Sequence, residues 1–222
     1  MDLINDIAQW FLLLAIFAAF LISSIFRRNK ELVPIQLYIF LLFVVNVVMK
    51  LLIHLSKPET YKYLSTSIIN LFSVLEIIII YYFLYFKIKR IQFRILMGFF
   101  LTLFLSTCVI FWTVRKNTLF SFAPDLFGLE CLLITIPCLF YVYEILRTEY
   151  FLDLKSNVKF IITCGLLFNF SLLVPIYFSW STLFQINPDF NKILNFLSIL
   201  FYSLLVIVFV KAYLCPITVQ KQ

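Results

Sequence analysis

The sequence predicts an all-α fold, a polytopic membrane helix bundle with seven transmembrane helices. Of its 222 residues, 64% are hydrophobic and 13% are charged, whereas soluble domains are about 45–50% apolar and about 25% charged. Seven apolar stretches each reach the roughly 20 residues that a helix needs to cross the hydrocarbon core of a bilayer. Helices are expected rather than strands, because a helix satisfies all its backbone hydrogen bonds within one segment.

The spans and their short connections make up a single domain, residues 1–222. The limits of the spans, to within about three residues, are 5–26, 33–54, 63–86, 92–114, 120–146, 159–180 and 192–214. The longest connection, near 147–158, is too short for a soluble domain. We therefore expect any signalling or catalytic domain to belong to another chain.

The first span has the charge order of an uncleaved membrane helix. Acidic Asp2 and Asp6 lie at its start, and Arg27 and Arg28 follow its end. A cleavable signal peptide begins with basic residues and has a shorter apolar segment. This order predicts a retained first helix with the N-terminus outside.

The connections carry an asymmetric charge that predicts orientation. Twelve Lys and Arg residues fall in or beside the connections on one side, and six on the other. Because cytoplasmic loops are enriched in Lys and Arg, we expect the N-terminus outside and the C-terminus in the cytoplasm of a bacterial cell, with the chain in the cytoplasmic membrane. The net charge of +7 reflects this asymmetry, and no dense basic face predicts a nucleic-acid partner.

The second span places Asn46, Lys50 and His54 at intervals of four residues. This spacing puts all three on one helix face, which we expect to turn toward the bundle interior. The alternative is that Lys50 and His54 are interfacial residues whose polar ends reach water near the outer boundary. Both interpretations remain open from the sequence.

The third span contains the most unusual residue of the chain. Ser67, Asn70, Ser73 and Glu76 recur every three residues, and Glu76 lies eleven residues before Lys87. At 1.5 Å per residue, Glu76 is about 16 Å from the inner boundary, near the middle of the membrane. Ionisable groups at this depth are costly and mark either a ligand, ion or proton site or a structural hydrogen-bond node.

The fourth and fifth spans add a boundary marker and a second acidic group. Trp112, at the outer end of the fourth span, is typical of the aromatic belt at a membrane interface. Glu130 in the fifth span lies about 25 Å from the inner side, roughly at the depth of Lys50. We expect a Lys50–Glu130 ion pair to offset two desolvation costs. Glu144, at the inner end, is expected to be a solvated boundary charge.

The sixth and seventh spans complete a polar interior. Asn169 is level with Glu76, and Asn195, Ser198 and Tyr202 lie on one side of the last span. The polar residues form a middle layer of Glu76, Asn169 and Asn46 and an outer layer of Lys50, Glu130 and Asn195. These layers form either a cavity open to the outside or interhelical hydrogen bonds in a packed bundle. The candidate ligand-binding or ion-binding residues are Glu76, Asn70, Ser73, Asn46, Lys50, Glu130, Asn169 and Asn195.

Enzymatic chemistry is not expected. The chain has one histidine and three glycines, too few for a histidine metal centre or a phosphate-binding glycine loop. No serine lies in a nucleophile elbow, and the five cysteines form no CxxC pair. We therefore expect no cofactor, no metal and no disulfide framework.

Two resemblances bear on function. The motifs Asn70-Leu-Phe-Ser73 and Asn195-Phe-Leu-Ser198 occupy equivalent places if the helices form two repeats in a 3+1+3 order. In helix number, orientation and these paired asparagines, the chain is similar in topology to SWEET-type sugar transporters. It departs from them in having Pro34-Ile-Gln36 in place of a Pro-Gln motif and no proline in the first helix.

The last third of the chain, from Tyr150 to Cys215, resembles a family of small uncharacterised bacterial seven-helix membrane proteins. The matching stretches are Leu154-Lys155-Ser156-Asn157, Lys159-Phe160, Phe201-Tyr202 and Lys211-Ala212-Tyr213-Leu214-Cys215. Such proteins are often encoded beside sensor kinases, so the resemblance implies a sensory role with a protein partner. We expect a receptor-like or accessory protein that senses a small-molecule or lipid ligand. The alternatives are a small-solute transporter or channel and a structural subunit of a larger membrane complex.

Overall fold

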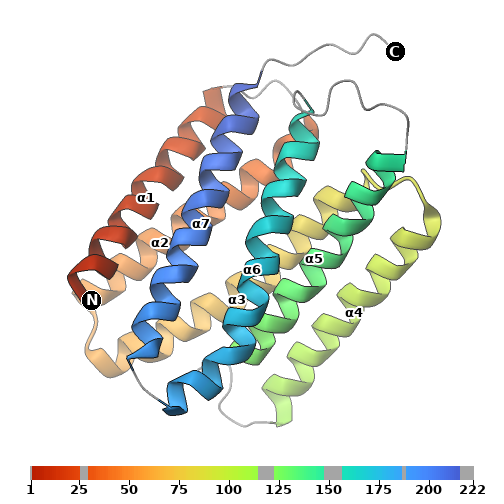
Figure 1. Cartoon of the computed structure of the whole chain (residues 1–222). Coiled ribbons are helices and arrows are strands. Elements are labelled where there is room, and N and C mark those ends of the chain that lie inside the picture. Colours follow the sequence, from red (N-terminus) through yellow and green to blue (C-terminus); the bar gives the residue numbers. More distant parts are fainter. Residues whose placement is uncertain (1, 26–29, 115–122, 148–156, 187–188, 216–222) are drawn as a thin grey trace.

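Seven long helices make up most of the described structure, a computed structural model (Figure 1). It describes residues 2–25, 30–114, 123–147, 157–186 and 189–215, and contains no strand within them. The elements are α1 (Asp2–Ile25), η1 (Lys30–Leu32), α2 (Val33–Leu55), α3 (Pro58–Tyr85), α4 (Ile91–Val114), α5 (Pro124–Arg147), α6 (Val158–Ile186) and α7 (Phe190–Leu214). All seven α-helices are long and apolar enough to cross a membrane, which confirms the predicted fold class.

The helix ends differ from the predicted spans at three places. The fifth helix begins at Pro124, where the sequence predicts a start at residue 120, and residues 120–122 lie outside the described residues. Proline is favoured in the first turn because its missing N–H has no partner there in any case. Helices α3 and α6 extend beyond their apolar spans, which are Tyr63–Tyr85 and Val158–Trp180. Hydropathy marks the part of a helix that lies in lipid and misses polar turns beyond it.

The helices follow one another around a ring. Each packs on the next one in sequence, α7 closes the ring against α1, and α3 also contacts α5. Helix α4 packs on α3 and α5 at the edge of the bundle, as Figure 1 shows. Helices α3 and α5 are therefore enclosed on several sides, and these two helices carry Glu76 and Glu130.

The outer surface of the bundle is apolar. Large side chains such as those of Phe11, Leu14, Phe99 and Ile110 are more than half exposed. An apolar surface of this extent on a soluble monomer would be a strong aggregation risk. In a bilayer it is the surface that contacts lipid, so the exposed residues support the membrane assignment independently of helix length.

Helices α6 and α7 approach closely at Gly165. A Cβ atom at this position would lie 2.7 Å from Val208 Cγ1 and 3.2 Å from Val208 Cβ. Gly98 of α4 differs, because nothing lies within 4 Å of a Cβ built there. The absence of a side chain at Gly165 thus determines how α6 and α7 pack.

Candidate functional site

Two buried acidic residues meet at the centre of the bundle. Glu76 of α3 is 3% exposed and Glu130 of α5 is 1% exposed, and their carboxyl groups contact each other. The Tyr38 hydroxyl donates a hydrogen bond of 2.5 Å to Glu76 Oε1, and Tyr202 of α7 also hydrogen-bonds to Glu76. The Ser73 hydroxyl, one turn before Glu76, donates to Glu130 Oε2. Four helices thus supply one network, which we call the acid pair and its hydroxyl donors.

No basic side chain among the described residues forms an ion pair with the acid pair. Within the part of the chain that the structure describes, neither Glu76 nor Glu130 forms an ion pair. The second oxygen of Glu130, Oε1, has no hydrogen-bond partner among the described residues. Without a counter-charge among these residues, each carboxyl group of the acid pair is either an uncompensated negative charge or protonated.

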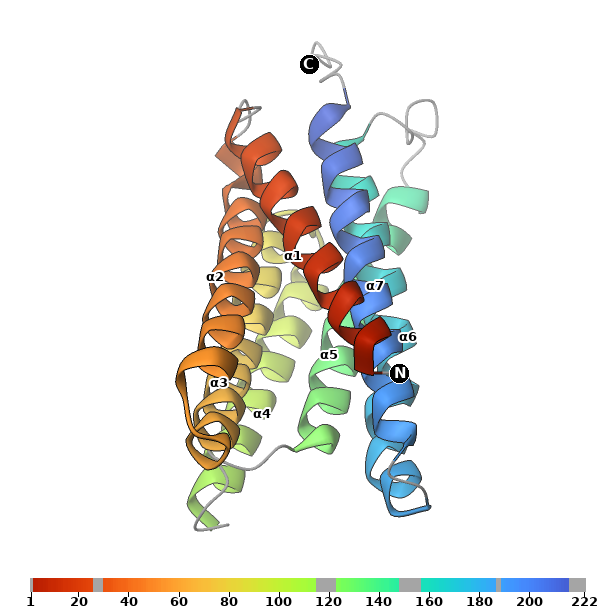
Figure 2. The ribbon, with the colours of Figure 1, turned by 90° about the vertical axis from the view of Figure 1, so that its left-hand side faces the viewer.

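A cavity of about 260 Å³ leads to Glu76. Its lining residues come from α1, α2, α3, α5, α6 and α7, in the half of the bundle that contains the α2–α3 connection. This half, which we call the α2–α3 end, is the lower end in Figure 2. The polar residues of the lining are Gln9, Asn46, Lys50, Tyr61, Glu76, Tyr177, Asn195, Ser198 and Tyr202. The structure contains features of both predicted alternatives: a cavity, and interhelical hydrogen bonds such as those from Tyr38 to Glu76 and from Ser73 to Glu130.

The predicted Lys50–Glu130 ion pair is wrong. Lys50 Nζ lies 2.6 Å from Asp6 Oδ1 and 5.0 Å from the centre of the Trp10 ring, both on α1. Equal depth does not place two residues on facing sides of their helices. Lys50 turns toward α1 near the α2–α3 end, where its charge reaches water and an exposed partner at lower cost than in the interior.

The other predicted residues fall into two groups. Asn46 and Asn195 line the cavity with Glu76 and Lys50. The remaining four, Asn70, Ser73, Glu130 and Asn169, are buried but do not line it. Asn46 Nδ2 donates to the Leu42 carbonyl oxygen at 2.8 Å. The Asn169 amide has no hydrogen-bond partner within the described residues.

Sequence reasoning named Tyr202 but missed Tyr38 and Tyr177. Tyr38 precedes Asn46 by eight residues and so lies on the same face of α2, a signal that the sequence contained. Tyr177 lines the cavity from α6 and hydrogen-bonds to Ser198. Aromatic residues are common in membrane helices, which hides the few that donate a hydrogen bond to a buried acid.

The chain matches no protein-family model, no curated protein and no solved structure. The resemblances to SWEET-type transporters and to bacterial seven-helix proteins therefore stay predictions. The function of the site is therefore inferred from the positions and contacts of its own residues.

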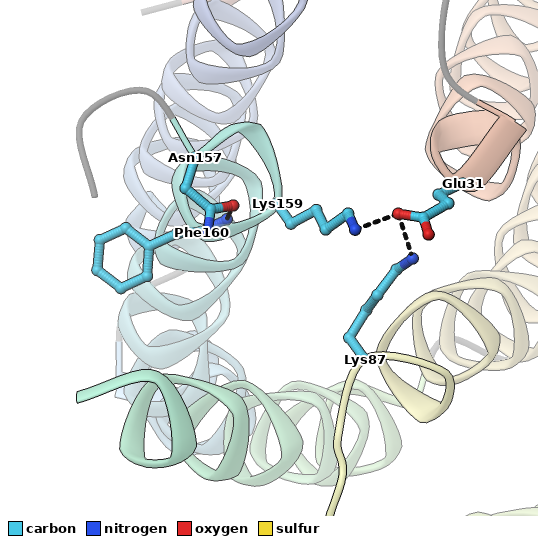
Figure 3. A network of polar contacts seen from close by, with 5 residues as sticks. All are labelled: Glu31, Lys87, Asn157, Lys159 and Phe160. Carbon is cyan, nitrogen blue, oxygen red and sulfur yellow. Dashed lines mark hydrogen bonds and ion pairs between the residues drawn. The ribbon is translucent and has the colours of Figure 1, made fainter. Parts of the chain in front are cut away.

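The opposite end of the bundle is held by a second polar cluster. Glu31 Oε2, in η1 between α1 and α2, accepts from Lys87 Nζ at 2.9 Å and from Lys159 Nζ (Figure 3). Lys87 follows α3 and Lys159 lies in the first turn of α6, where Asn157 Oδ1 accepts the Phe160 N–H. The cluster of Glu31, Lys87 and Lys159, which we call the lysine clamp, joins three parts of the ring.

Glu144 is more than the solvated boundary charge that its position predicts. Its two carboxylate oxygens accept the backbone N–H groups of Lys89 and Arg90, each at 2.8 Å. The carboxylate thereby fixes the α3–α4 connection against α5. The sequence could not reveal this role, because the donors are backbone groups that carry no residue-specific signal.

We expect the lysine clamp to give the protein an acid-sensitive contribution to stability. Hydrogen bonds from Lys159 and then Lys87 hold the pKa of Glu31 below its usual value. A carboxyl with a lowered folded-state pKa stabilises the fold above its unfolded pKa, and this contribution is lost as pH falls through the folded pKa. The Glu31 side chain is 48% exposed, so solvent screening limits the effect to less than about 1 kcal/mol.

The measurement is thermal unfolding of purified protein at neutral and acidic pH. Glu31→Gln should unfold at a lower temperature than wild type at neutral pH, and the difference should shrink in acid. Asp125→Asn, which changes an exposed carboxyl at the other end, is the control and should leave the melting curves unchanged. A constant difference between Glu31→Gln and wild type across the pH range would contradict the ionic role of Glu31.

Proposed function

We propose that the protein is a receptor-like membrane protein that binds a small solute in the cavity and acts through a partner protein. The observation that supports this most is the cavity, in which side chains from six helices surround a space that ends at a buried carboxyl group. Ligand cavities in proteins typically measure about 300–1,000 Å³. A volume of about 260 Å³ therefore favours a small solute.

Helix α3 connects the cavity to the lysine clamp. Glu76 contacts the solute space, and Lys87 follows the end of the same helix and pairs with Glu31. A displacement of α3 on solute binding would change the clamp, because a packed helix moves as a rigid element. Lys89 and Arg90 are exposed beside the clamp and offer positive charge to an acidic surface of a partner. A sensor kinase is the partner that the family resemblance implies.

The orientation is part of this proposal. The α2–α3 end, with the cavity, faces outside, and the end with the lysine clamp faces the bacterial cytoplasm. The excess of Lys and Arg in the connections at the clamp end supports this assignment. A solute outside the cell would then reach the cavity without crossing the membrane.

A second candidate, a small-solute transporter, is favoured by one observation. The cavity reaches the middle of the bundle from one end, while ion pairs join α3, α6 and the α1–α2 connection at the other. Carriers that work by alternating access place the solute site near the midplane and open one side at a time. Uptake of the bound solute into vesicles containing the purified protein would distinguish transport from sensing.

Solute binding is tested by filling the cavity. Ser198→Phe adds a ring to a residue of the lining, whereas Ser171→Phe adds the same ring on an exposed part of α6. Wild type and Ser171→Phe, purified in mild detergent, should retain a small molecule that native mass spectrometry detects. Ser198→Phe should lose it.

Asn195→Phe, at a half-buried position of the lining, provides a second cavity variant if Ser198→Phe unfolds. Thermal melting shows which variants are folded. Equal retention of small molecules by folded cavity variants and by Ser171→Phe would show that the cavity is not the binding site.

A further inference from the structure

We propose that the solute is a small organic cation, such as a protonated amine, and that its binding to Glu76 releases a proton held by the acid pair. This inference rests on the proposed function, because it names the chemical class of solute for the same cavity. It adds a coupled proton that solute binding alone does not require.

Burial and mutual contact limit the negative charge that the acid pair can carry. Glu76 and Glu130 contact each other in the interior of a membrane bundle, without a counter-charge among the described residues. Two ionised carboxylates in contact repel each other and both lose hydration, so one of the two ionises far more readily than the other. The acid pair therefore holds at least one proton in the empty protein.

In the described part of the chain, no side chain beside the acid pair supplies a positive charge in place of that proton. The other titratable side chains beside the acid pair are phenols and thiols, which carry no positive charge in either protonation state. They come from every helix packed around the pair and are Tyr38 of α2, Cys108 of α4, Cys131 of α5, Tyr177 of α6 and Tyr202 of α7. The nearest cation of the cavity, Lys50, is already neutralised by Asp6. A positive charge at Glu76 must therefore come from the solute.

The cavity lining around Glu76 is suited to a positively charged solute. Glu76 lines the cavity and Glu130 does not, so Glu76 is the carboxyl that a solute can reach. Aromatic side chains of Phe72, Phe127 and Tyr177 surround the same space. Ring faces attract cations, most strongly where water is excluded. A carboxylate among aromatic rings is suited to an ammonium group and repels an anion.

The exchange balances in atoms and charge. A solute R–NH3⁺ enters the cavity, the acid pair loses one H⁺ to water, and the ammonium group pairs with the Glu76 carboxylate. One positive charge enters and one leaves, so the net charge of the buried site is unchanged. No other reactant is needed.

The test uses three probes of matched shape and different charge: benzylammonium, benzyl alcohol and benzoate. Each is titrated calorimetrically into the wild-type protein in lipid nanodiscs, with Ser198→Phe as the reference for partition into lipid. Benzylammonium should bind at least about tenfold more tightly than benzyl alcohol, and benzoate should not bind. Repeating the titration in buffers of different ionisation enthalpy should show the release of close to one proton per benzylammonium.

Two variants separate a proton site from a structural one. Glu76→Gln should weaken benzylammonium binding by roughly ten- to a hundredfold and abolish proton release. Glu130→Gln leaves Glu76 in place, so it should retain benzylammonium binding while proton release falls. Asp125→Asn is the matched control for an exposed carboxyl and should change neither quantity. If the pair were merely structural, the folded variants would release as many protons per bound benzylammonium as wild type does.

Different results would contradict the cation class, the proton exchange and solute binding in the cavity. Cavity-dependent binding of benzyl alcohol as tight as that of benzylammonium would overturn the cation class and leave solute binding in place. Benzylammonium binding without proton release would overturn the exchange. Absence of benzylammonium binding would overturn the cation class, and the retained-molecule comparison of Ser198→Phe with Ser171→Phe would then decide the proposed function.

Discussion

Gly165→Ala should destabilise the protein by about 1–3 kcal/mol, the usual cost of an added methyl group in a packed core. The new Cβ would lie 2.7 Å from Val208 Cγ1, far inside van der Waals contact. Val208 cannot swing away easily, because a β-branched side chain has one strongly preferred rotamer in a helix. Helices α6 and α7 would have to separate, which would also displace the cavity residues Tyr177 and Asn195.

Gly98→Ala is the matched control for this prediction. Both substitutions replace a helical glycine and gain up to about 1 kcal/mol in helix propensity, but the Cβ at Gly98 meets nothing within 4 Å. Thermal unfolding of both variants in one detergent should show Gly98→Ala at or above the wild-type melting temperature and Gly165→Ala below it. Equal melting temperatures for the two variants would contradict the close packing of α6 on α7.

Tyr38→Phe should lower the free energy of unfolding by about 1–2 kcal/mol. The substitution keeps the buried ring and removes the hydroxyl that donates to Glu76 Oε1 at 2.5 Å. The cost arises because a buried carboxyl group loses a donor that water cannot replace. In membrane proteins such bonds average less than about 1 kcal/mol but reach about 1.7 kcal/mol, and a fully buried acid belongs at the upper end.

Tyr82→Phe serves as the control, because Tyr82 is on the same bundle but 58% exposed on the outer surface. The melting temperature of Tyr82→Phe should stay close to that of wild type. Proton release on benzylammonium binding should also change in Tyr38→Phe, since the hydroxyl helps to hold the charge at Glu76. A Tyr38→Phe protein that is indistinguishable from Tyr82→Phe in both measurements would remove Tyr38 from the network.

The seven helices could be predicted from the sequence because lipid imposes a simple rule of length and polarity. The same rule gives depth along each helix, and the central position of Glu76 follows from its distance to Lys87. Depth does not give the direction in which a side chain points around its helix. Depth alone therefore predicts a pair of Glu130 with Lys50, whereas Glu130 contacts Glu76 and Ser73.

The contacts of the lysine clamp could not be predicted from the sequence. Glu31 lies in a short connection with no periodic pattern, and its partners Lys87 and Lys159 are distant in sequence. Only the closed ring of helices brings the three residues together. From the sequence, Lys87 and Lys159 indicate orientation alone, because the positive-inside pattern explains their presence without any specific partner.

The central claim is that a water-filled cavity reaches inward from the outer side of the membrane. Cysteine accessibility in intact cells tests it most directly, on a background with the half-buried Cys164 and Cys215 replaced by alanine. Asn46→Cys places a thiol in the cavity lining. Leu71→Cys places one on the exposed surface of α3, also within the apolar span of its helix.

A charged, membrane-impermeant thiol reagent reacts with thiolates, which form where water has access. The account predicts that external reagent modifies Asn46→Cys and leaves Leu71→Cys unmodified. Equal inertness of both thiols in folded protein would contradict the cavity. Modification of Asn46→Cys only in inverted vesicles would show that the cavity opens to the cytoplasm and that the proposed orientation is wrong.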